Sequence, residues 1–431
     1  MKDMPSPLHA LHSSHRIGFV STRFNGTDGV SLETRKWAHV LQSLGHSVYY
    51  FAGKSDQPKE ISFVVPEAHF QHQDVQEIAN ISYRSKTRPQ KITHRIHELR
   101  SHLKDRLHDF IKKFDVELLI VENALSIPMN IPLGLAIAEL IAETDIPVIG
   151  HHHDFFWERK RFLVNCIGDY LEMAFPPRLP SIHHVVINSL AATEMGKRRG
   201  INVTVMPNVM DFDNPPDPPD EYTESLRADL GVNPDEYFFL QPTRPLQRKG
   251  IEYAFELIRR LGANARLVIS HAGGDEGNEY REHIRIYAEL LNVRVNFVSD
   301  IIDTERGTTK DGRKIYTLGD VYPQADLVTF PSLLEGFGNA FLEAVYYRRP
   351  IFVNNYTIYS IDIKPKGFQA VDFNGFVTEE TVKHVQTILK DREHTEEMTE
   401  HNYKLGKQYY SFTVLEQQLQ ILLHACFSRE R

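Results

Sequence analysis

The chain has 431 residues, more than a single hydrophobic core usually supports, so two domains of similar size are expected. Its 41% hydrophobic and 25% charged residues are typical of a globular protein and exclude the disordered, fibrous and disulfide-rich classes. The net charge of −8 argues against nucleic-acid and membrane-surface partners, and the two cysteines, Cys166 and Cys426, form no metal-binding motif.

Neither the N-terminus nor the most apolar stretch is typical of a targeting or membrane segment. The leading MKDMPSPLHALHSSH lacks the uninterrupted apolar run of a signal peptide. The stretch Leu118–Ala142 is interrupted by Glu122, Glu139 and prolines, so it does not fit a bilayer span. We therefore expect a cytoplasmic protein without a membrane partner.

The N-terminal half opens with a strand, a loop, a helix and a second strand. Arg16–Val20 is a short apolar run, and the loop STRFNGTDGVS follows it. Leu32–Leu44 then has helical spacing, Gly45 ends the helix, and Val48–Ala52 predicts the next strand. This βαβ order predicts a Rossmann-like domain with a parallel sheet.

The rest of this half continues the same alternation. Ile92–Phe114 has one apolar stripe at helical spacing and predicts a helix that covers the sheet. Compact apolar runs predict three further buried strands, at Glu117–Val121, Pro147–Gly150 and His184–Asn188. Between Pro207 and Asp235 the periodicity fails in a segment rich in proline and aspartate, which predicts the connection between the domains.

A second alternation of strands and helices fills the C-terminal half. Its predicted elements are strand Tyr237–Gln241, helix Ile251–Leu261, strand Arg266–Ser270, helix Asn278–Leu291 and strand Val293–Val298. The polar segment Asp303–Lys314 predicts an exposed insertion, either a plain loop or a mobile lid. Tyr409–Phe427 carries the apolar stripe of a last helix.

The segment Ala325–Asn355 is the most informative for function. It predicts a strand, a turn with the sequence EGFG, a helix and another strand, and its two carboxylates, Glu335 and Glu343, are eight positions apart. The glycines allow a ligand close to the backbone, and the start of the next helix offers N–H groups to an anion. A carboxylate farther along such a helix suits the hydrogen bonds of a ribose diol.

These residues, with the preceding proline and serine, resemble the donor-site signature of the retaining family-4 glycosyltransferases of the GT-B fold. In that family the first glutamate lies beside the transferred sugar and the second binds the nucleotide ribose. The resemblance implies these roles for Glu335 and Glu343. It also implies that the backbone around four residues contacts the donor, namely Gly336, Phe337, Gly338 and Asn339.

Two loops add to the resemblance. In QPTRPLQRKG, Arg244 and Lys249 match the family's basic pair, which would neutralise the leaving diphosphate without a metal or other cofactor. In TRFNGTDGVS the family usually has two adjacent glycines. Here Asp28 replaces the first, and Gly29 keeps the expected close approach to the diphosphate.

The segment GHHHDFFWERKRF follows a buried strand, where parallel sheets usually place ligands. The resemblance implies that a histidine here contacts the transferred sugar, with His153 as the best match and His152 as the alternative. Asp154, Trp157 and Arg159 would lie on the acceptor side. A metal site formed by all three histidines is disfavoured, because consecutive residues of an extended segment point in alternating directions.

Taken together, the resemblance implies an α/β protein of the GT-B fold, with two Rossmann-like doubly wound domains facing a central cleft. Residues 1–207 would form the acceptor-side domain, the last helix at about 411–431 would pack back onto it, and 208–410 would bind the nucleotide-sugar donor. Donor binding would close the two domains.

The activity implied is retaining, metal-independent transfer of a hexose from GDP-mannose or UDP-glucose to a small soluble acceptor. GDP-mannose is slightly favoured as the donor. The segment IYSIDIKPKGF and the insertion are similar to enzymes that make compatible-solute glycosides such as mannosylglucosylglycerate. The alternatives are a GT-B nucleotide-sugar epimerase, a phosphorylase, or a nucleotide-sugar-binding protein without catalysis. A homodimer is compatible with the sequence.

Overall fold

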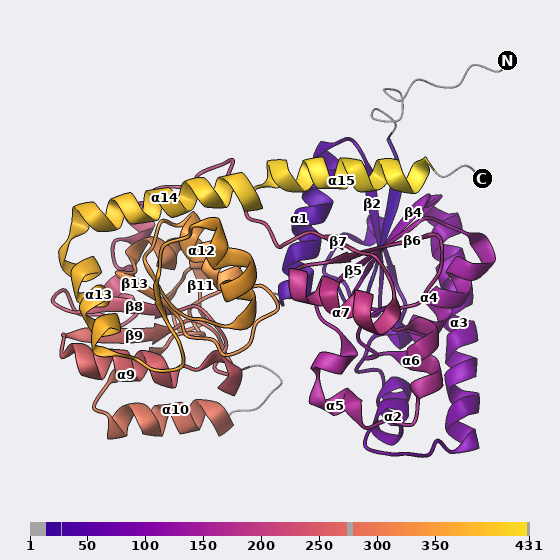
Figure 1. Cartoon of the computed structure of the whole chain (residues 1–431), viewed down its shortest axis with the longest axis horizontal. Helices are drawn as coiled ribbons and strands as arrows, with labels where there is room; N and C mark the ends of the chain where they lie inside the picture. Colours follow the sequence, from indigo (N-terminus) through magenta and orange to yellow (C-terminus); the bar gives the residue numbers. More distant parts are fainter. Residues whose placement is uncertain (1–13, 27, 274–278, 429–431) are drawn as a thin grey trace. The chain divides into compact units, whose positions relative to one another are not determined.

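The computed structural model describes residues 14–26, 28–273 and 279–428. The chain divides into two units. The first consists of Met1–Asn208 with Phe412–Arg431, and the second of Val209–Ser411. Each unit has its own parallel sheet with helices packed on it (Figure 1), which confirms the predicted α/β fold class with two Rossmann-like domains.

The sheet of the first unit has seven parallel strands in the order β3-β2-β1-β4-β5-β6-β7. The order reverses direction beside β1, as in doubly wound sheets, whose ligands lie beyond the carboxyl ends of the strands. Its strands are β1 Arg16–Val20, β2 Ser47–Ala52, β3 Ser62–Val64, β4 Leu118–Glu122, β5 Val148–His152, β6 Ile182–Val186 and β7 Thr204–Val205.

The helices of this unit cover the sheet with apolar stripes. In α3 every apolar side chain of the predicted stripe except Ile111 is buried, and α3 packs against the almost wholly buried α4. The helices are α1 Gly29–Ser43, α2 Gln73–Ser82, α3 Gln90–Phe114, α4 Ile131–Thr144, α5 Lys160–Leu163, α6 Gly168–Ala174, α7 Ser189–Arg199 and α15 Phe412–Phe427.

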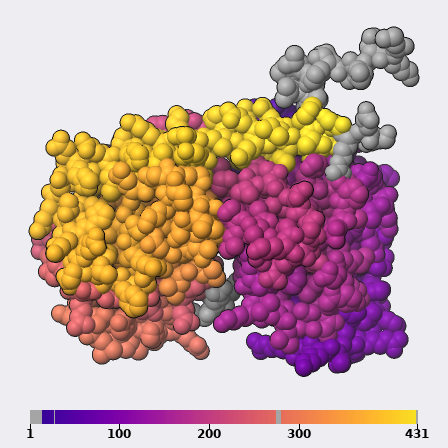
Figure 2. All heavy atoms as spheres, viewed as in Figure 1, coloured from indigo at the N-terminus to yellow at the C-terminus, as the bar shows by residue number. Residues whose placement is uncertain are grey.

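Helix α15 joins the first unit although it ends the chain. It packs against α1 and buries five side chains, Leu415, Leu419, Leu422, Leu423 and Cys426. The yellow atoms of α15 cover one end of the purple and magenta unit (Figure 2).

The sheet of the second unit has six parallel strands in the order β10-β9-β8-β13-β14-β15. Its strands are β8 Tyr237–Gln241, β9 Ala265–Ile269, β10 Arg294–Phe297, β13 Leu327–Phe330, β14 Ile351–Asn354 and β15 Val371–Phe373. Its helices are α8 Leu226–Asp229, α9 Glu252–Leu261, α10 Glu279–Leu290, α11 Leu318–Val321, α12 Asn339–Tyr346, α13 Glu379–Lys390 and α14 Arg392–Tyr410.

The predicted insertion forms a small antiparallel hairpin of β11 Gly307–Thr308 and β12 Lys314–Ile315. Arg306 forms ion pairs with Asp220 at 2.6 Å and with Asp320 at 2.5 Å. The Tyr222 hydroxyl oxygen lies 2.9 Å from the carbonyl oxygens of both Gly307 and Ile315, one on each hairpin strand, and shares its single proton between them. The hairpin is therefore fastened at its base to the segment that precedes α8, which favours a fixed insertion over a mobile lid.

Within the described residues, no helix combines the length and the apolar character that crossing a bilayer requires.

Candidate active site

Two groups of polar side chains match the predicted site residues, one in each unit. The group in the first unit lies where β4 and β5 end side by side. Both strands run farther than the sequence patterns predict, so Glu122 closes β4 and His152 closes β5. In the sheet register Glu122 stands directly opposite His151. Both side chains are fully buried.

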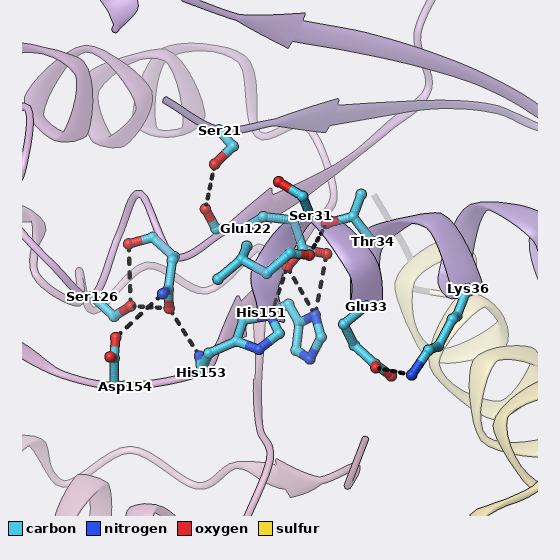
Figure 3. A network of polar contacts seen from close by, with 12 residues as sticks. Ser21, Ser31, Glu33, Thr34, Lys36, Glu122, Ser126, His151, His153 and Asp154 are labelled. Atoms are coloured by element: carbon cyan, nitrogen blue, oxygen red, sulfur yellow. Dashed lines mark hydrogen bonds and ion pairs between the residues drawn. The ribbon is translucent and has the colours of Figure 1, made fainter. Parts of the chain in front are cut away.

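His151 and His153 converge on the carboxylate of Glu122 (Figure 3). The Nδ1 atom of His151 lies 3.1 Å from Oε1 of Glu122, and the Nε2 atom of His153 lies 3.0 Å from Oε2. Sequence reasoning predicted His153 but missed Glu122 and His151. Two histidines two positions apart on an extended segment share a face, and that spacing was the available signal.

The environment gives the members of this group different protonation states. Burial works to raise the pKa of Glu122, but the two imidazoles lower it to about 2. Burial lowers the pKa of His151. At His153 burial acts in the same direction, yet the hydrogen bond to Glu122 and its charge raise the pKa above the ordinary histidine value. Glu122 is thus ionised, and His153 is the histidine that favours the charged form.

His152 points the other way and does not join this group. Its Nε2 lies 2.9 Å from Nδ1 of His184, and both rings are buried. Burial lowers the pKa of His152 well below its usual value and brings the pKa of His184 to about 4. His152 is therefore a neutral core residue, which favours His153 as the candidate for sugar contact.

The neighbouring predicted residues have structural partners. The Asp154 carboxylate pairs with Arg159 and accepts from the Asn123 amide at 3.2 Å. Trp157 stacks on Phe155 with ring centroids 4.5 Å apart. Asp154 and Arg159 thus lie beside His153, whereas the Trp157 ring is engaged in packing.

The loop before α1 carries a carboxylate at the N-terminus of that helix. Asp28 is the N-cap of α1, where its carboxylate accepts from the backbone N–H groups of Val30 and Ser31 at 3.2 Å. It also pairs with Arg23 at 3.3 Å. Because Asp28 occupies these N–H groups, the geometry gives less support to a diphosphate beside Gly29 than to the other predicted contacts.

The second group lies in the second unit, beyond the ends of β8 and β13. The Lys249 ammonium bonds the Glu335 carboxylate at 2.5 Å, and both side chains are close to nine-tenths buried. Arg248 approaches the same carboxylate at 3.2 Å from a more exposed position. Burial lowers the pKa of Lys249, and although Glu335 opposes that shift, Arg248 and Arg244 add to it.

The loops that carry this pair are held by close backbone contacts. Gly250 has φ +60°, and a Cβ there would lie 2.6 Å from the Pro331 carbonyl oxygen. Gly338, the N-cap of α12, has φ +126°, and a Cβ there would collide with the Tyr356 hydroxyl, which donates to the Phe337 carbonyl at 2.7 Å. Both glycines are required by their conformation, and the turn containing Glu335 is fixed from two sides.

Glu343 lies on α12, the helix that follows this turn. It accepts a hydrogen bond of 2.6 Å from the Tyr322 hydroxyl, and burial raises the pKa of that phenol. The carboxylate is half-buried. Its orientation is thus fixed by a neutral donor, as a ribose-binding carboxylate requires.

Sequence reasoning did not select His271, which follows β9 at the same end of the sheet. Its Nδ1 lies 2.9 Å from the Ser270 hydroxyl oxygen. Burial, with the charges of Arg244 and Lys249, lowers its pKa to about 4. His271 is a neutral neighbour of the basic residues, and only the packing of the loops after β8 and β9 reveals it.

A cavity of about 500 Å³ lies elsewhere in the second unit, between the segment before α8, the hairpin base and the end of α12. Its lining includes Arg306, Asp320 and Tyr346 but none of the predicted site residues.

Comparisons with known proteins agree with the fold. Residues 223–405 match the family model described as glycosyl transferases group 1. The chain is 32% identical over 386 residues to mannosylglucosylglycerate synthase of Petrotoga mobilis, covering 82% of this chain and 86% of that protein. It is 29% identical over 435 residues to the enzyme of the same name from Thermotoga maritima, covering 93% and 98%.

Among solved structures, Alr3699/HepE of Anabaena in complex with UDP-glucose superposes with a TM-score of 0.66 at 13% identity, covering 95% of this chain and 99% of that one. That likeness shows the fold, which is GT-B.

Proposed function

This chain belongs to the group 1 glycosyl transferases, and we propose that it transfers a hexose from a nucleoside-diphosphate sugar to a small sugar acid. The observation that carries the proposal is the buried pair of Lys249 and Glu335, on two loops that Gly250 and Gly338 hold in place. Glu335 belongs to the donor-site signature and Lys249 to the family's basic pair. Support for the substrate class comes from similarity to mannosylglucosylglycerate synthases over most of the chain.

At the donor, the second unit supplies the groups that stabilise departure of the diphosphate. The bond from the sugar C1 to the diphosphate oxygen breaks, and negative charge builds on that oxygen. Lys249 lies in a poorly hydrated position, where a fixed cation stabilises such charge more strongly than it would in water. Arg244 adds a second cation, so we propose that no divalent metal is obligatory.

Transfer is completed by the acceptor hydroxyl, whose oxygen bonds C1 while its proton passes to the leaving diphosphate. We propose that attack occurs on the face from which the diphosphate leaves, which retains the anomeric configuration. Glu335 would lie beside the transferred sugar, and Glu343 would accept hydrogen bonds from the ribose hydroxyls. The backbone of residues 336–339 would contact the donor, and Gly29 stays a prediction for the diphosphate.

Recognition of the sugars is assigned to the first unit. His153 would donate a hydrogen bond to a hydroxyl of the transferred hexose. Asp154 and Arg159 form an ion pair beside it and offer an acceptor and a cation to the hydroxyls and carboxylate of a sugar acid. We keep GDP-mannose as the favoured donor, because the products named for both relatives contain mannose.

The direct test is the structure of the product. The purified protein is incubated with GDP-mannose and glucosylglycerate in the presence of EDTA, and the product is analysed by NMR. We expect one new glycosidic linkage with the α configuration of the donor. A β linkage would contradict retention, and product formation only after addition of a divalent ion would contradict metal independence.

The same reaction separates the alternatives. Conversion of the donor into a different nucleotide sugar without any acceptor would indicate an epimerase. Phosphate-dependent cleavage of the acceptor would indicate a phosphorylase. Tight donor binding with no turnover over a broad acceptor panel would indicate a binding protein.

We also propose that the protein works in the cytoplasm. The sequence has two cysteines, Cys166 and Cys426, and they form no disulfide with each other, which suits a reducing compartment.

A further inference from the structure

The proposed function uses His153 but leaves Glu122 without a role. This carboxylate is fully buried at the end of β4, where an ionised side chain is costly unless it is paired. Its partners are two imidazoles presented by the adjacent chain segment, as Figure 3 shows. Such a buried charge calls for a physical explanation.

Hydrogen-bond chemistry fixes the protons of this group. An ionised carboxylate can only accept, so the ring nitrogens that face Glu122 must each donate. His153 therefore carries a proton on Nε2, 3.0 Å from Oε2, and its Nδ1 is the nitrogen left to meet a ligand. His151 carries its proton on Nδ1, 3.1 Å from Oε1.

The three side chains could be considered as metal ligands, because their donor atoms all lie within 4.8 Å of one another. Two features favour hydrogen bonding. One nitrogen of each imidazole, Nδ1 of His151 and Nε2 of His153, lies within hydrogen-bond distance of a Glu122 oxygen. Within the described part of the chain the group also provides three ligands, one fewer than a closed tetrahedral site needs.

Further contacts keep His153 in one orientation. Its backbone N–H donates to the side-chain oxygen of Asn123 at 2.8 Å, and the Ser126 hydroxyl donates to the same oxygen at 3.0 Å. Trp37 stacks on the His151 ring with centroids 4.1 Å apart, which supports the group from α1. The imidazole of His153 is thus held through both its ring and its backbone.

We infer that Glu122 is a positioning residue for His153, holding the imidazole so that its other ring nitrogen presents an N–H to a hydroxyl of the transferred sugar. This inference rests on the proposed sugar contact of His153. It assigns Glu122 no contact with the substrate. The carboxylate acts through the imidazole, as buried acids do behind many functional histidines.

The charged groups around His153 favour its cationic form. Glu122 faces it from β4 and His151 from β5. Glu33 acts on it from α1, where it is paired with Lys36, and Asp154 acts from the following residue. Carboxylates dominate this set, in agreement with the raised pKa of His153. Activity should therefore decline as His153 loses its proton on the alkaline side.

The test combines NMR titration of histidine-labelled protein with the pH profile of kcat/KM. In the wild type we expect His153 to titrate above pH 6.5, the ordinary value. In Glu122→Gln, which keeps the side-chain shape but removes the charge, the His153 pKa should fall by about one pH unit. The alkaline limb of the kcat/KM profile should move to lower pH by the same amount. Glu122→Gln should therefore lose about tenfold in kcat/KM at pH 8 and much less at pH 6.

Glu236→Gln is the matched control. Glu236 lies in the second unit, directly before β8, and its carboxylate is also buried. It forms an ion pair with Arg266 at 2.8 Å. This variant should lower thermal stability without moving the pH profile or the His153 titration. Glu122→Asp should restore part of the wild-type profile, because the charge remains while the distance changes.

Several outcomes would overturn the inference. One is a wild-type His153 pKa at or below 6.5, which is informative even if Glu122→Gln does not fold. Others are an equal loss in Glu122→Gln at every pH, or a stoichiometric metal ion in the wild type that is lost in the variant. Failure of the inference can be told apart from failure of the proposed function, because the titration of His153 needs no turnover. Full activity in His153→Ala would show that His153 makes no sugar contact needed for activity, and would leave the proposed transfer reaction standing.

Discussion

At the scale of single residues, two cations share the Glu335 carboxylate but differ in environment. Lys249 is nearly buried at 2.5 Å, whereas the Arg248 side chain keeps 42% of its surface exposed at 3.2 Å. A charge held away from water interacts more strongly with an anion than one screened by solvent. Lys249 is therefore the cation on which leaving-group stabilisation should depend.

Replacing each cation by alanine tests this difference. We expect Lys249→Ala to lower kcat by about 100- to 1000-fold, the usual effect of removing one group that stabilises charge in the transition state. Arg248→Ala should lower kcat by less than about tenfold, because solvent already screens its charge. Steady-state kinetics with the preferred donor measure both, and equal losses would contradict the assignment.

The residues within contiguous motifs could be named from the sequence, because Lys249, Glu335 and Glu343 follow fixed spacings along single loops and one helix. Glu122 and His271 could not. Their positions depend on the register of neighbouring strands and on which loops meet at a sheet edge, and the predicted strand at Glu117–Val121 ended one residue too early to include Glu122. Neither register nor strand ends are fixed by apolar patterns alone.

At the scale of elements, α15 shows how a terminal helix stabilises the first unit. Leu419 is fully buried, whereas Ile421, two residues farther along the helix, keeps 69% of its surface exposed. Leu419→Ala should lower the free energy of unfolding by about 2–5 kcal/mol, because it removes buried apolar contacts and leaves a cavity. Ile421→Ala should change it by less than about 0.5 kcal/mol. Denaturant unfolding compares them, and equal effects would exclude this packing.

The hairpin of β11 and β12 yields a second prediction for an element. Arg306→Ala removes the contacts to Asp220 and the buried Asp320, so the unfolding midpoint should fall by a few degrees. Arg313→Ala, which loses only exposed partners, should have a smaller effect. Both should keep kcat within about twofold if the hairpin is a fixed insertion. A large loss of kcat in Arg306→Ala at unchanged stability would instead indicate a lid.

The polar composition of Asp303–Lys314 predicted an exposed insertion but not its anchoring, because Arg306 pairs with Asp220, 86 residues away in the sequence, and with Asp320, which lies outside the insertion. The parallel order of strands and helices was easier to predict, since each βαβ unit is specified locally by apolar runs of characteristic length.

At the scale of the whole molecule, buried neutral histidines make stability dependent on pH. The pKa of His184 is about 4 in the folded chain and near 6.5 when exposed, so the unfolded chain binds more protons between these values. Stability should therefore fall as the pH drops from 6.5 to 4, by roughly 3 kcal/mol for this group. His152, with its lowered pKa, acts in the same direction.

Thermal unfolding between pH 7 and pH 5 measures this dependence. We expect His184→Gln to have a smaller decline in midpoint than the wild type, because its side chain does not titrate. His94→Gln, a change at an exposed position, should decline as the wild type does. A His184→Gln profile parallel to that of the wild type would contradict the assigned protonation.

The central claim is that the second unit binds a nucleotide sugar whose sugar is transferred to an acceptor. Its most direct test is nucleoside-diphosphate release from GDP-, UDP- and ADP-sugars, with and without glucosylglycerate, for the wild type and Glu335→Ala. The account predicts that the acceptor stimulates release from one donor, with GDP-mannose favoured, and that Glu335→Ala abolishes it. Nucleoside-diphosphate release that does not depend on the acceptor, or that is unchanged in Glu335→Ala, would contradict this claim.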